Sequence, residues 1–329
     1  MARHIRLFGL ASLVVTDDPV EIAVFLQHPG LDREYAVAGP LINRIITGSV
    51  KRQFDLNGRY WLSLRSRNDP ERKHSQLDLR QRLGGFSVAA SWSPAVIEAL
   101  GAYVAGAGSR DTAYAALAYG AAFPFRSMTP GGDAGFNIAQ YRQIFRLYRR
   151  INRARSPISP RGIFIRMNGG HIRARNALLR FMGGDPSGLH SVAVTLDNAI
   201  TLLENMREAF GERRARKSPG SSAPANGLNA PFPWAEVRTA PVLVLRQARA
   251  AVMLPHVAAR VPANTLIIMR MRDSLESGAP GGYELAAKSW SYCPATRYLH
   301  AFFGAVWQAA LDGRAKAQGS SAMAKGAAA

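Results

Sequence analysis

The two stretches that decide the fold lie in the last third of the chain. They read APVLVLRQARAAVMLPHVAARVPANTLIIMRM over residues 240–271 and SYCPATRYLHAFFGAVWQAAL over residues 291–311. The first holds two short runs of β-forming residues, 242–245 and 266–271, separated by prolines, which predicts a small sheet. The second places apolar side chains at helical spacing after Pro294, which predicts a helix that runs to about Leu311.

Cys293 is the single cysteine of the 329 residues, so an internal disulfide and a cysteine-rich zinc site are both excluded. Pro294 is a favoured first residue of a helix, and we therefore expect the sulfur at or just before the positive end of that helix. A thiolate is stabilised there and can act as a metal ligand or nucleophile. The alternative is a buried thiol that packs as a small apolar side chain.

The order of motifs around the cysteine resembles the C-terminal third of bacterial cytochrome P-450 proteins, which are haem-thiolate enzymes. In that family an Arg-x-x-Pro-Pro segment is followed by Arg-x-Ala, an Asp-Val-x-Leu strand, Ile-Pro-Ala-Gly-Thr and the haem-binding cysteine of a long helix. The matching residues here are Arg238-Thr239-Ala240-Pro241-Val242, Arg246-Gln247-Ala248, Val252-Met253-Leu254, Val261-Pro262-Ala263-Asn264-Thr265 and Cys293-Pro294-Ala295.

Two segments upstream are also similar to the family. Val15-Thr16-Asp17-Asp18-Pro19, together with the helix predicted to reach Gln27, resembles its first strand and helix. Asp69-Pro70-Glu71-Arg72-Lys73-His74 resembles its Asp-Pro-Pro-x-His segment, whose histidine contacts a haem propionate. The match is good from Pro233 to Leu311 and thin before it.

The resemblance implies a haem b group whose iron is bound by the Cys293 thiolate. It implies that Arg246 and His74 bind the anionic propionates and that Arg238 holds the core of the fold. Each of these residues also has an ordinary interpretation. Arg246 can be a solvated strand residue, and His74 can be an imidazole on a helix surface.

The chain departs from the family pattern just before the cysteine. The family has Phe, Gly and a basic residue where this chain has Ala286, Ser289 and Ser291, so one cationic partner of a propionate is missing. The glutamate that pairs with the arginine of Glu-x-x-Arg should fall at Ala235, but the glutamate here is Glu236. These departures, together with the shorter chain, favour a divergent and shortened bacterial member.

The largest departure concerns oxygen chemistry. The family's long central helix carries an acid and an alcohol that deliver protons to dioxygen. The predicted helix over residues 189–210 offers Thr195, Asp197 and Thr201 but no Gly-x-Asp-Thr. Residues two apart on a helix do not point together, so we interpret Asp197 as a solvated residue. A general-acid route is therefore not identified, and the catalytic residues stay unassigned.

Composition and charge set the remaining limits. Apolar residues make up 47% and charged residues 19%, a globular balance, and no apolar run approaches the roughly 18 residues that a spanning helix needs. Residues 7–15 lack the cleavage site of a signal peptide, and we expect a cytoplasmic protein. The net charge is +20, but the arginines are spread along the whole chain, and we interpret Arg149-Arg150 as part of a solvated face. A dedicated nucleic-acid role is therefore not favoured.

We therefore predict a mainly α fold with a small β region, a single cytochrome P-450-like haem domain over residues 1–312. It would contain a surface loop at 213–233 and be followed by a disordered tail at 313–329. The resemblance implies a monooxygenase- or peroxygenase-like oxidation of a small apolar substrate, with an acidic ferredoxin or flavodoxin-type electron donor. The alternative from another class is a non-catalytic haem-binding or basic nucleic-acid-binding protein with a degenerate fold of this kind.

Overall fold

The structure is a computed structural model that describes residues 2–56, 59–60, 65–86, 92–126, 135–155, 159–216, 244–254, 257, 260–270 and 295–326. The chain divides into two compact units. The first unit comprises Met1–Arg80, Tyr148–Ala177 and Ala240–Thr296, and the second comprises Gln81–Leu147, Leu178–Thr239 and Arg297–Ala329. Each unit is described separately, and the predicted boundaries of a haem domain stay a prediction.

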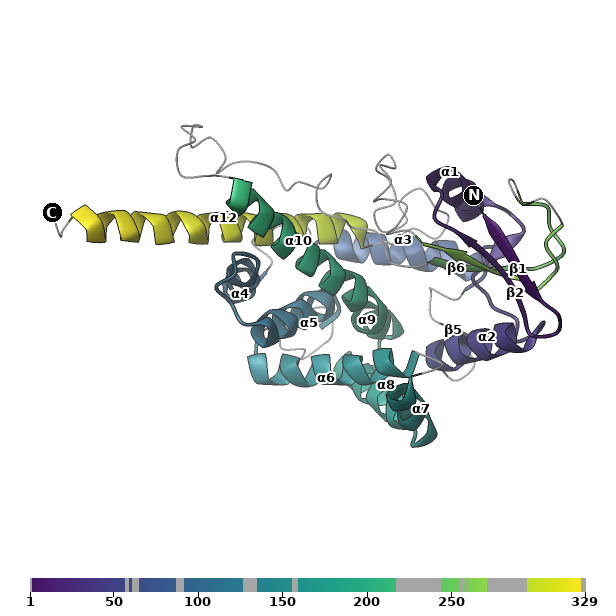
Figure 1. The fold of residues 1–329 in the computed structure, drawn as a ribbon. Coiled ribbons are helices and arrows are strands. Elements are labelled where there is room, and N and C mark those ends of the chain that lie inside the picture. The colour runs from purple at the N-terminus through teal and green to yellow at the C-terminus, as the bar shows by residue number, and fades with distance from the viewer. Residues whose placement is uncertain are drawn as a thin grey trace. The chain divides into compact units, whose positions relative to one another are not determined.

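All strands of the five-stranded sheet belong to the first unit (Figure 1). The strands are β1 (Arg3–Leu7), β2 (Ala11–Thr16), β3 (Leu31–Asp32), β4 (Asp55–Leu56), β5 (Arg59–Tyr60), β6 (Val244–Ala248) and β7 (Leu266–Met269). The helices of the chain are α1 (Pro19–Gln27), α2 (Leu41–Phe54), α3 (Pro70–Gly84), α4 (Pro94–Val104), α5 (Arg110–Arg126), α6 (Ile138–Arg155), α7 (Pro160–Met167), α8 (Gly170–Phe181), α9 (Pro186–His190), α10 (Leu196–Arg216) and α12 (Thr296–Gly326). The predicted mainly helical fold with a small β region is confirmed.

The sheet joins the start of the chain to the stretch after residue 240. Its strand order is β1-β2-β7-β6-β3, in which β2 and β7 run parallel and the other neighbours are antiparallel. The apolar run from Arg6 to Val15 by itself predicts a single strand, and this prediction is wrong, because β1 and β2 form a hairpin. Gly9 at its turn has φ +65°, a left-handed conformation that glycine adopts without steric cost. Long-range pairing thus assembles the sheet from two distant segments.

The two faces of the sheet bury different apolar groups. One face packs Val14, Ile267 and Met269 against Ile22 and Phe25 of α1. On the other face, Leu13, Leu245 and Leu266 pack together with Tyr35 and with Ile46 and Val50 of α2. Figure 1 shows α1 and α2 on opposite sides of the strands. Side chains that alternate along a strand therefore serve two cores.

Helix α1 has the bounds that the sequence predicts, because its start is well capped. The Asp18 carboxylate accepts hydrogen bonds from the backbone N–H groups of Val20 and Glu21, and Pro19 occupies the first turn. These two hydrogen bonds lower the pKa of the Asp18 carboxyl, and the bond from the Glu21 N–H has the larger effect. This local chemistry needs no distant partner, which is why the sequence predicted it.

The turn before β7 explains one departure from the family motif. Asn264 stands where Ile-Pro-Ala-Gly-Thr has its glycine, and it has φ 63°. Asparagine is one of the few residues that tolerate this left-handed conformation. The Asn264 carbonyl accepts a hydrogen bond from Asn43, and Thr265 bonds to Ser12 at 2.7 Å. The turn is thus compatible with asparagine in place of glycine.

The second unit is a helical bundle in which α4 and α5 pack closely on α12. A Cβ added at Gly101 of α4 would lie 2.7 Å from the Cβ of Ala309, and one added at Gly120 of α5 would lie 2.7 Å from the Phe302 ring. The Tyr298 hydroxyl donates to the Gly120 carbonyl at 2.7 Å. Helix α12 confirms the prediction of a long helix after residue 294.

Several elements differ from the sequence prediction. Helices α2 and α7 were not predicted, and a π-helical turn over Ser191–Thr195 divides the predicted helix 189–210 into α9 and α10. Helix α12 continues to Gly326, into the stretch expected to be a disordered tail, and its alanines and lysines favour helix. None of the helices in the described part of the chain combines the length and apolar character that crossing a bilayer requires.

Candidate functional site

The predicted axial ligand, Cys293, lies outside the described residues, and so does Arg238. The nearest described residue is Ala295, which is buried, and α12 begins at Thr296. The predicted helix therefore follows the cysteine closely. The thiolate itself stays a prediction.

Arg246 lies on β6 and is deeply buried. Its exposed fraction is 1%, and it is among the largest fully buried side chains among the described residues. Its Nη1 donates to the carbonyl of Leu245 at 2.8 Å, and the Tyr35 hydroxyl donates to the same oxygen at 3.0 Å. The interpretation of Arg246 as a solvated strand residue is therefore wrong.

A second buried arginine, Arg72, interacts electrostatically with Arg246. Arg72 lies on α3, is 2% exposed, and donates from Nη1 to the carbonyl of Arg65 at 2.6 Å. Burial and then the charge of Arg33 lower the pKa of both Arg72 and Arg246 to about 9. We define Arg72 and Arg246, together with the half-buried Arg33, as the buried arginine cluster. Its cations repel one another, and burial removes hydration from Arg72 and Arg246.

The nearby carboxylate of Asp32 is occupied by other donors. Its Oδ1 accepts from the backbone N–H groups of Arg33, Glu34 and Arg67, and its Oδ2 accepts from the Ser66 hydroxyl at 2.6 Å. Asp32 raises the pKa of both Arg72 and Arg246, and Asp69 raises that of Arg72, so these carboxylates partly offset the effects of burial and of the charge of Arg33.

Sequence reasoning missed Arg72 although it lies two residues before His74. The buried residues of α3 are Arg72, Gln76, Leu79 and Leu83, which recur at helical spacing. Extending the apolar stripe of Leu79 and Leu83 backward would have found Arg72. His74 lies on the exposed side of α3. Its assignment as a propionate ligand stays a prediction.

The segment predicted as the oxygen-activating helix forms a π-helical turn followed by α10. Asp197 is exposed in the first turn of α10, and the Thr201 hydroxyl donates to the backbone carbonyl of Asp197 at 3.2 Å. Thr195 ends the π-helical turn. The interpretation of Asp197 as a solvated residue agrees with its exposure.

The described residues form no metal site from side chains alone. Within them, no group of three His, Cys, Asp or Glu side chains could hold a metal ion. The buried arginine cluster supplies cationic donors, and guanidinium groups are the donors that bind carboxylates best.

Comparison with known proteins gives a fold-level similarity. No protein-family model matches the chain, and no curated protein matches it. The chain is similar to the crystal structure of CYP175A1 from a strain of Thermus thermophilus, with 14% identity, a TM-score of 0.47, and coverage of 94% of this chain and 83% of that one. It is also similar to a six-coordinated cytochrome P450 from another strain of the same organism, with 16% identity, a TM-score of 0.45, and coverage of 91% and 84%. Such values do not establish a family, so function is inferred from the residues themselves.

Proposed function

We propose that the chain is a haem-thiolate oxidoreductase in which Cys293 binds the iron and the buried arginine cluster binds the propionates. The observation that supports this proposal best is Arg246. It is a buried cation on the strand that carries the Arg-x-Ala motif. Arg72 adds a second buried donor, and His74 is kept as a candidate contact at the exposed side of α3.

The residues of the cluster would have three tasks. Arg246 and Arg72 would neutralise and orient the carboxylates, while Asp32 would hold the neighbouring backbone in place through its bonds to Arg33 and Arg67. Burial raises the pKa of the Tyr35 hydroxyl, so it stays a neutral donor to the Leu245 carbonyl. Haem bound through a thiolate supplies oxidation chemistry of the monooxygenase or peroxygenase type toward a small apolar substrate.

The positive net charge bears on the choice of electron donor. The net charge of +20 would favour an acidic ferredoxin or flavodoxin-type donor through electrostatic steering. Peroxide would replace that donor if the protein acts as a peroxygenase. Both routes use the same thiolate.

The decisive experiment is a carbon monoxide difference spectrum of the reduced, haem-loaded protein. We expect a thiolate-type Soret band that disappears in Cys293→Ser and persists in the control Ser291→Ala. A colourless protein after haem loading, or an unchanged spectrum in Cys293→Ser, would contradict the proposal.

A second experiment separates turnover from binding. Peroxide and a panel of small apolar substrates should give oxygenated products with the wild-type protein and none with Cys293→Ser. Intact haem without any product would leave a haem-binding protein and remove the enzyme assignment.

The alternative of a basic binding protein is favoured by one specific observation. Residues 134–184 contain eleven arginines and no Asp or Glu. Gel-shift titration with duplex DNA and single-stranded RNA at 150 mM salt tests this alternative. Tight binding by a haem-free protein would favour it over the oxidoreductase.

A further inference from the structure

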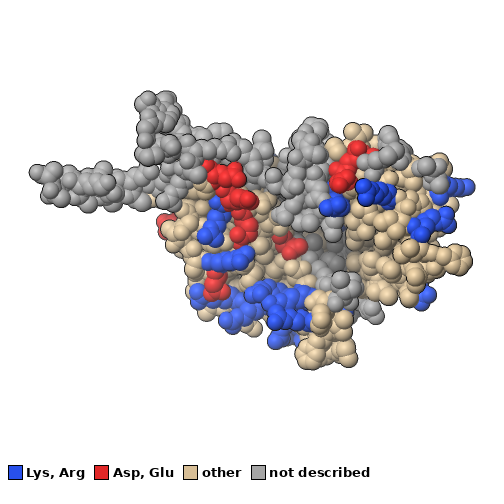
Figure 2. Space-filling model, viewed as in Figure 1, with Lys and Arg blue, Asp and Glu red and all other residues tan. Residues whose placement is uncertain are grey.

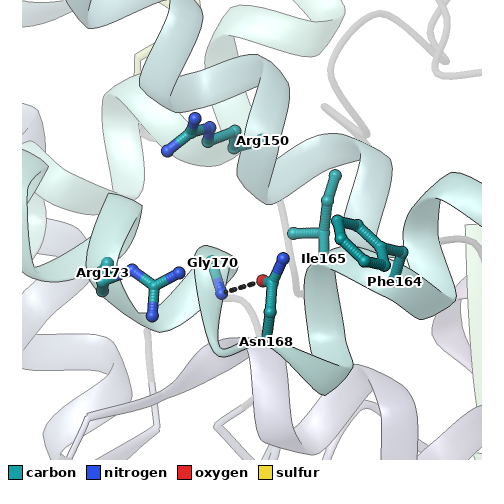
Figure 3. Close-up of a pocket in the computed structure, with 6 residues that line it drawn as sticks. All are labelled: Arg150, Phe164, Ile165, Asn168, Gly170 and Arg173. Atoms are coloured by element: carbon teal, nitrogen blue, oxygen red, sulfur yellow. Dashed lines mark hydrogen bonds between the residues drawn. The ribbon is translucent and has the colours of Figure 1, made fainter.

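A pocket in the first unit lies outside everything assigned to haem. It has a volume of about 150 Å³ and is lined by Arg150 of α6, Phe164 and Ile165 of α7, Asn168, and Gly170 and Arg173 of α8. Figure 3 shows Arg150 and Arg173 on different sides of the open centre, with Asn168 and the two apolar residues completing its wall. Three successive helices therefore contribute to one small site.

The polar groups that line this pocket are suited to donate hydrogen bonds. The Oδ1 of Asn168 already accepts from the backbone N–H of Gly170 at 2.9 Å, which leaves its amide N–H groups as donors. The side chains of Arg150 and Arg173 form no hydrogen bond or ion pair in the described structure, and both are exposed. Two guanidinium groups and an amide thus surround a space without a carboxylate.

The surroundings add positive charge. In the first-unit segment Tyr148–Ala177 there are eight arginines and no acidic residue. The pKa of Arg153 is lowered from its ordinary value. The charge of Arg149 has the largest effect, burial the second largest and the charge of Arg161 the smallest. The repulsion among these cations would be relieved by a bound anion.

The segment also exposes apolar side chains beside the cations. Phe164 is 67% exposed and Met167 is 83% exposed, and Ile163 shares their side of α7. In the lower part of Figure 2, a blue patch of Lys and Arg lies beside a tan projection, at the place of α7 in Figure 1. Cations next to exposed apolar groups are typical of surfaces that bind anionic amphiphiles.

We propose that this pocket binds the phosphate group of an anionic amphiphile, with Arg150, Arg173 and the Asn168 amide as donors and α7 as the apolar contact. Three donors, two from α6 and α8 and one from the turn between α7 and α8, match the several oxygens of a phosphate better than the two of a carboxylate. A pocket of this volume accommodates one such group and not the successive phosphates of a nucleic-acid strand. The site is independent of haem, and its test needs no haem signal.

The test measures binding of the full chain to two sources of the same phosphate chemistry. One arm is co-sedimentation with vesicles of phosphatidylglycerol, compared with vesicles of phosphatidylcholine. The other arm is calorimetry with glycerol phosphate and with a soluble short-chain phosphatidic acid. Binding that is weakened by Phe164→Ser identifies a lipid source, and binding that is unaffected by it identifies a free phosphate compound.

The variants distinguish a built site from diffuse charge. Arg150→Gln and Arg173→Gln should each weaken binding by about tenfold or more, since each removes charge-assisted hydrogen bonds. Asn168→Asp should weaken binding at least as much, because it adds a negative charge and keeps the acceptor for Gly170. The matched control Arg44→Gln, on α2 and exposed, should change binding by less than about twofold.

Three outcomes would overturn the proposal. The first is the absence of binding to every phosphate probe at 150 mM salt. The second is an equal loss of binding in Arg44→Gln, which would indicate non-specific attraction. The third is nucleic-acid binding that depends on Arg150 and Arg173 while no amphiphile binds. Circular dichroism and thermal unfolding of each variant establish that the comparison is made between folded proteins.

Discussion

Two groups of arginines in the first unit carry the same charge in opposite surroundings. Arg246 and Arg72 are almost fully buried, whereas Arg150 and Arg173 are exposed around a pocket. The buried pair has lost hydration, so its free energy depends strongly on a specific counter-charge. The exposed pair keeps its hydration, and its attraction to anions is screened by salt. A buried arginine is therefore suited to hold a resident group, and an exposed one to bind a partner reversibly.

The largest expected effect separates the two groups by haem affinity. Arg246→Gln should weaken haem binding by about tenfold or more, because a buried charge-assisted contact to a propionate is lost. Arg150→Gln, which removes the same charge from the surface, should leave haem affinity within about twofold. Titration of the haem-free protein with hemin, followed by absorbance, measures both. Equal affinities for wild type and Arg246→Gln would show that the buried cluster does not bind the propionates.

The second prediction concerns salt. Raising NaCl from 50 to 500 mM shortens the Debye length from about 14 Å to about 4 Å, so vesicle binding through the exposed pocket should fall at least about tenfold. Haem affinity should change by less than about threefold, since buried groups are screened little. Co-sedimentation and hemin titration at both salt concentrations make this comparison. A haem affinity that falls as steeply as vesicle binding would place the propionate contacts at the surface.

The third prediction uses pH. The pKa of Arg246 is lowered to about 9 by burial and by Arg33, from an ordinary value near 12.5. Between these values the unfolded chain binds more protons than the folded chain, so stability contributed by this group rises with pH. From pH 9 to 10 the free energy of unfolding of the haem-free wild type should rise by about 1 kcal/mol relative to Arg246→Met.

Urea unfolding at pH 9 and pH 10 provides this measurement. The matched pair of wild type and Arg150→Met should show no such relative change, because Arg150 is exposed. If the wild type lost stability relative to Arg246→Met over this range, the lowered pKa of Arg246 would be wrong in sign.

The smallest effect tests the neighbour of the buried cluster. Tyr35→Phe removes the donor to the Leu245 carbonyl, which still accepts from Arg246. The free energy of unfolding should fall by about 1 kcal/mol, the usual contribution of one hydrogen bond, while haem affinity stays within about twofold. Urea unfolding and hemin titration measure the two quantities. A large loss of haem affinity would make Tyr35 a positioning residue for the cofactor.

The success of the sequence prediction depended on how local the signal was. Asp18 and Pro19 predicted the start of α1 because capping involves neighbours in the chain. Helix α7 was missed although Ser159 and Pro160 carry the same kind of signal, because Ile163 and Phe164 favour strands as well. The hairpin of β1 and β2 was read as one strand because its apolar run continues through Gly9.

The candidate site was predicted only in part for a different physical reason. Arg246 was identified by a motif, but the same motif was compatible with a solvated side chain. Its burial depends on strands and loops that come from residues 31–36 and 244–248, far apart in the chain. Arg72 was missed because a charged residue on a helix is usually exposed.

The amino-acid sequence by itself determined the single thiol before a helix, the capped starts of helices and the absence of acidic residues from 134 to 184. These are properties of neighbouring residues or of composition. Only the tertiary structure decided that Arg72 and Arg246 are buried and interact with Asp32, and that Arg150 and Arg173 line a common pocket. Solvation and electrostatic interaction depend on what lies around a charge in space, and residues distant in the chain supply those surroundings.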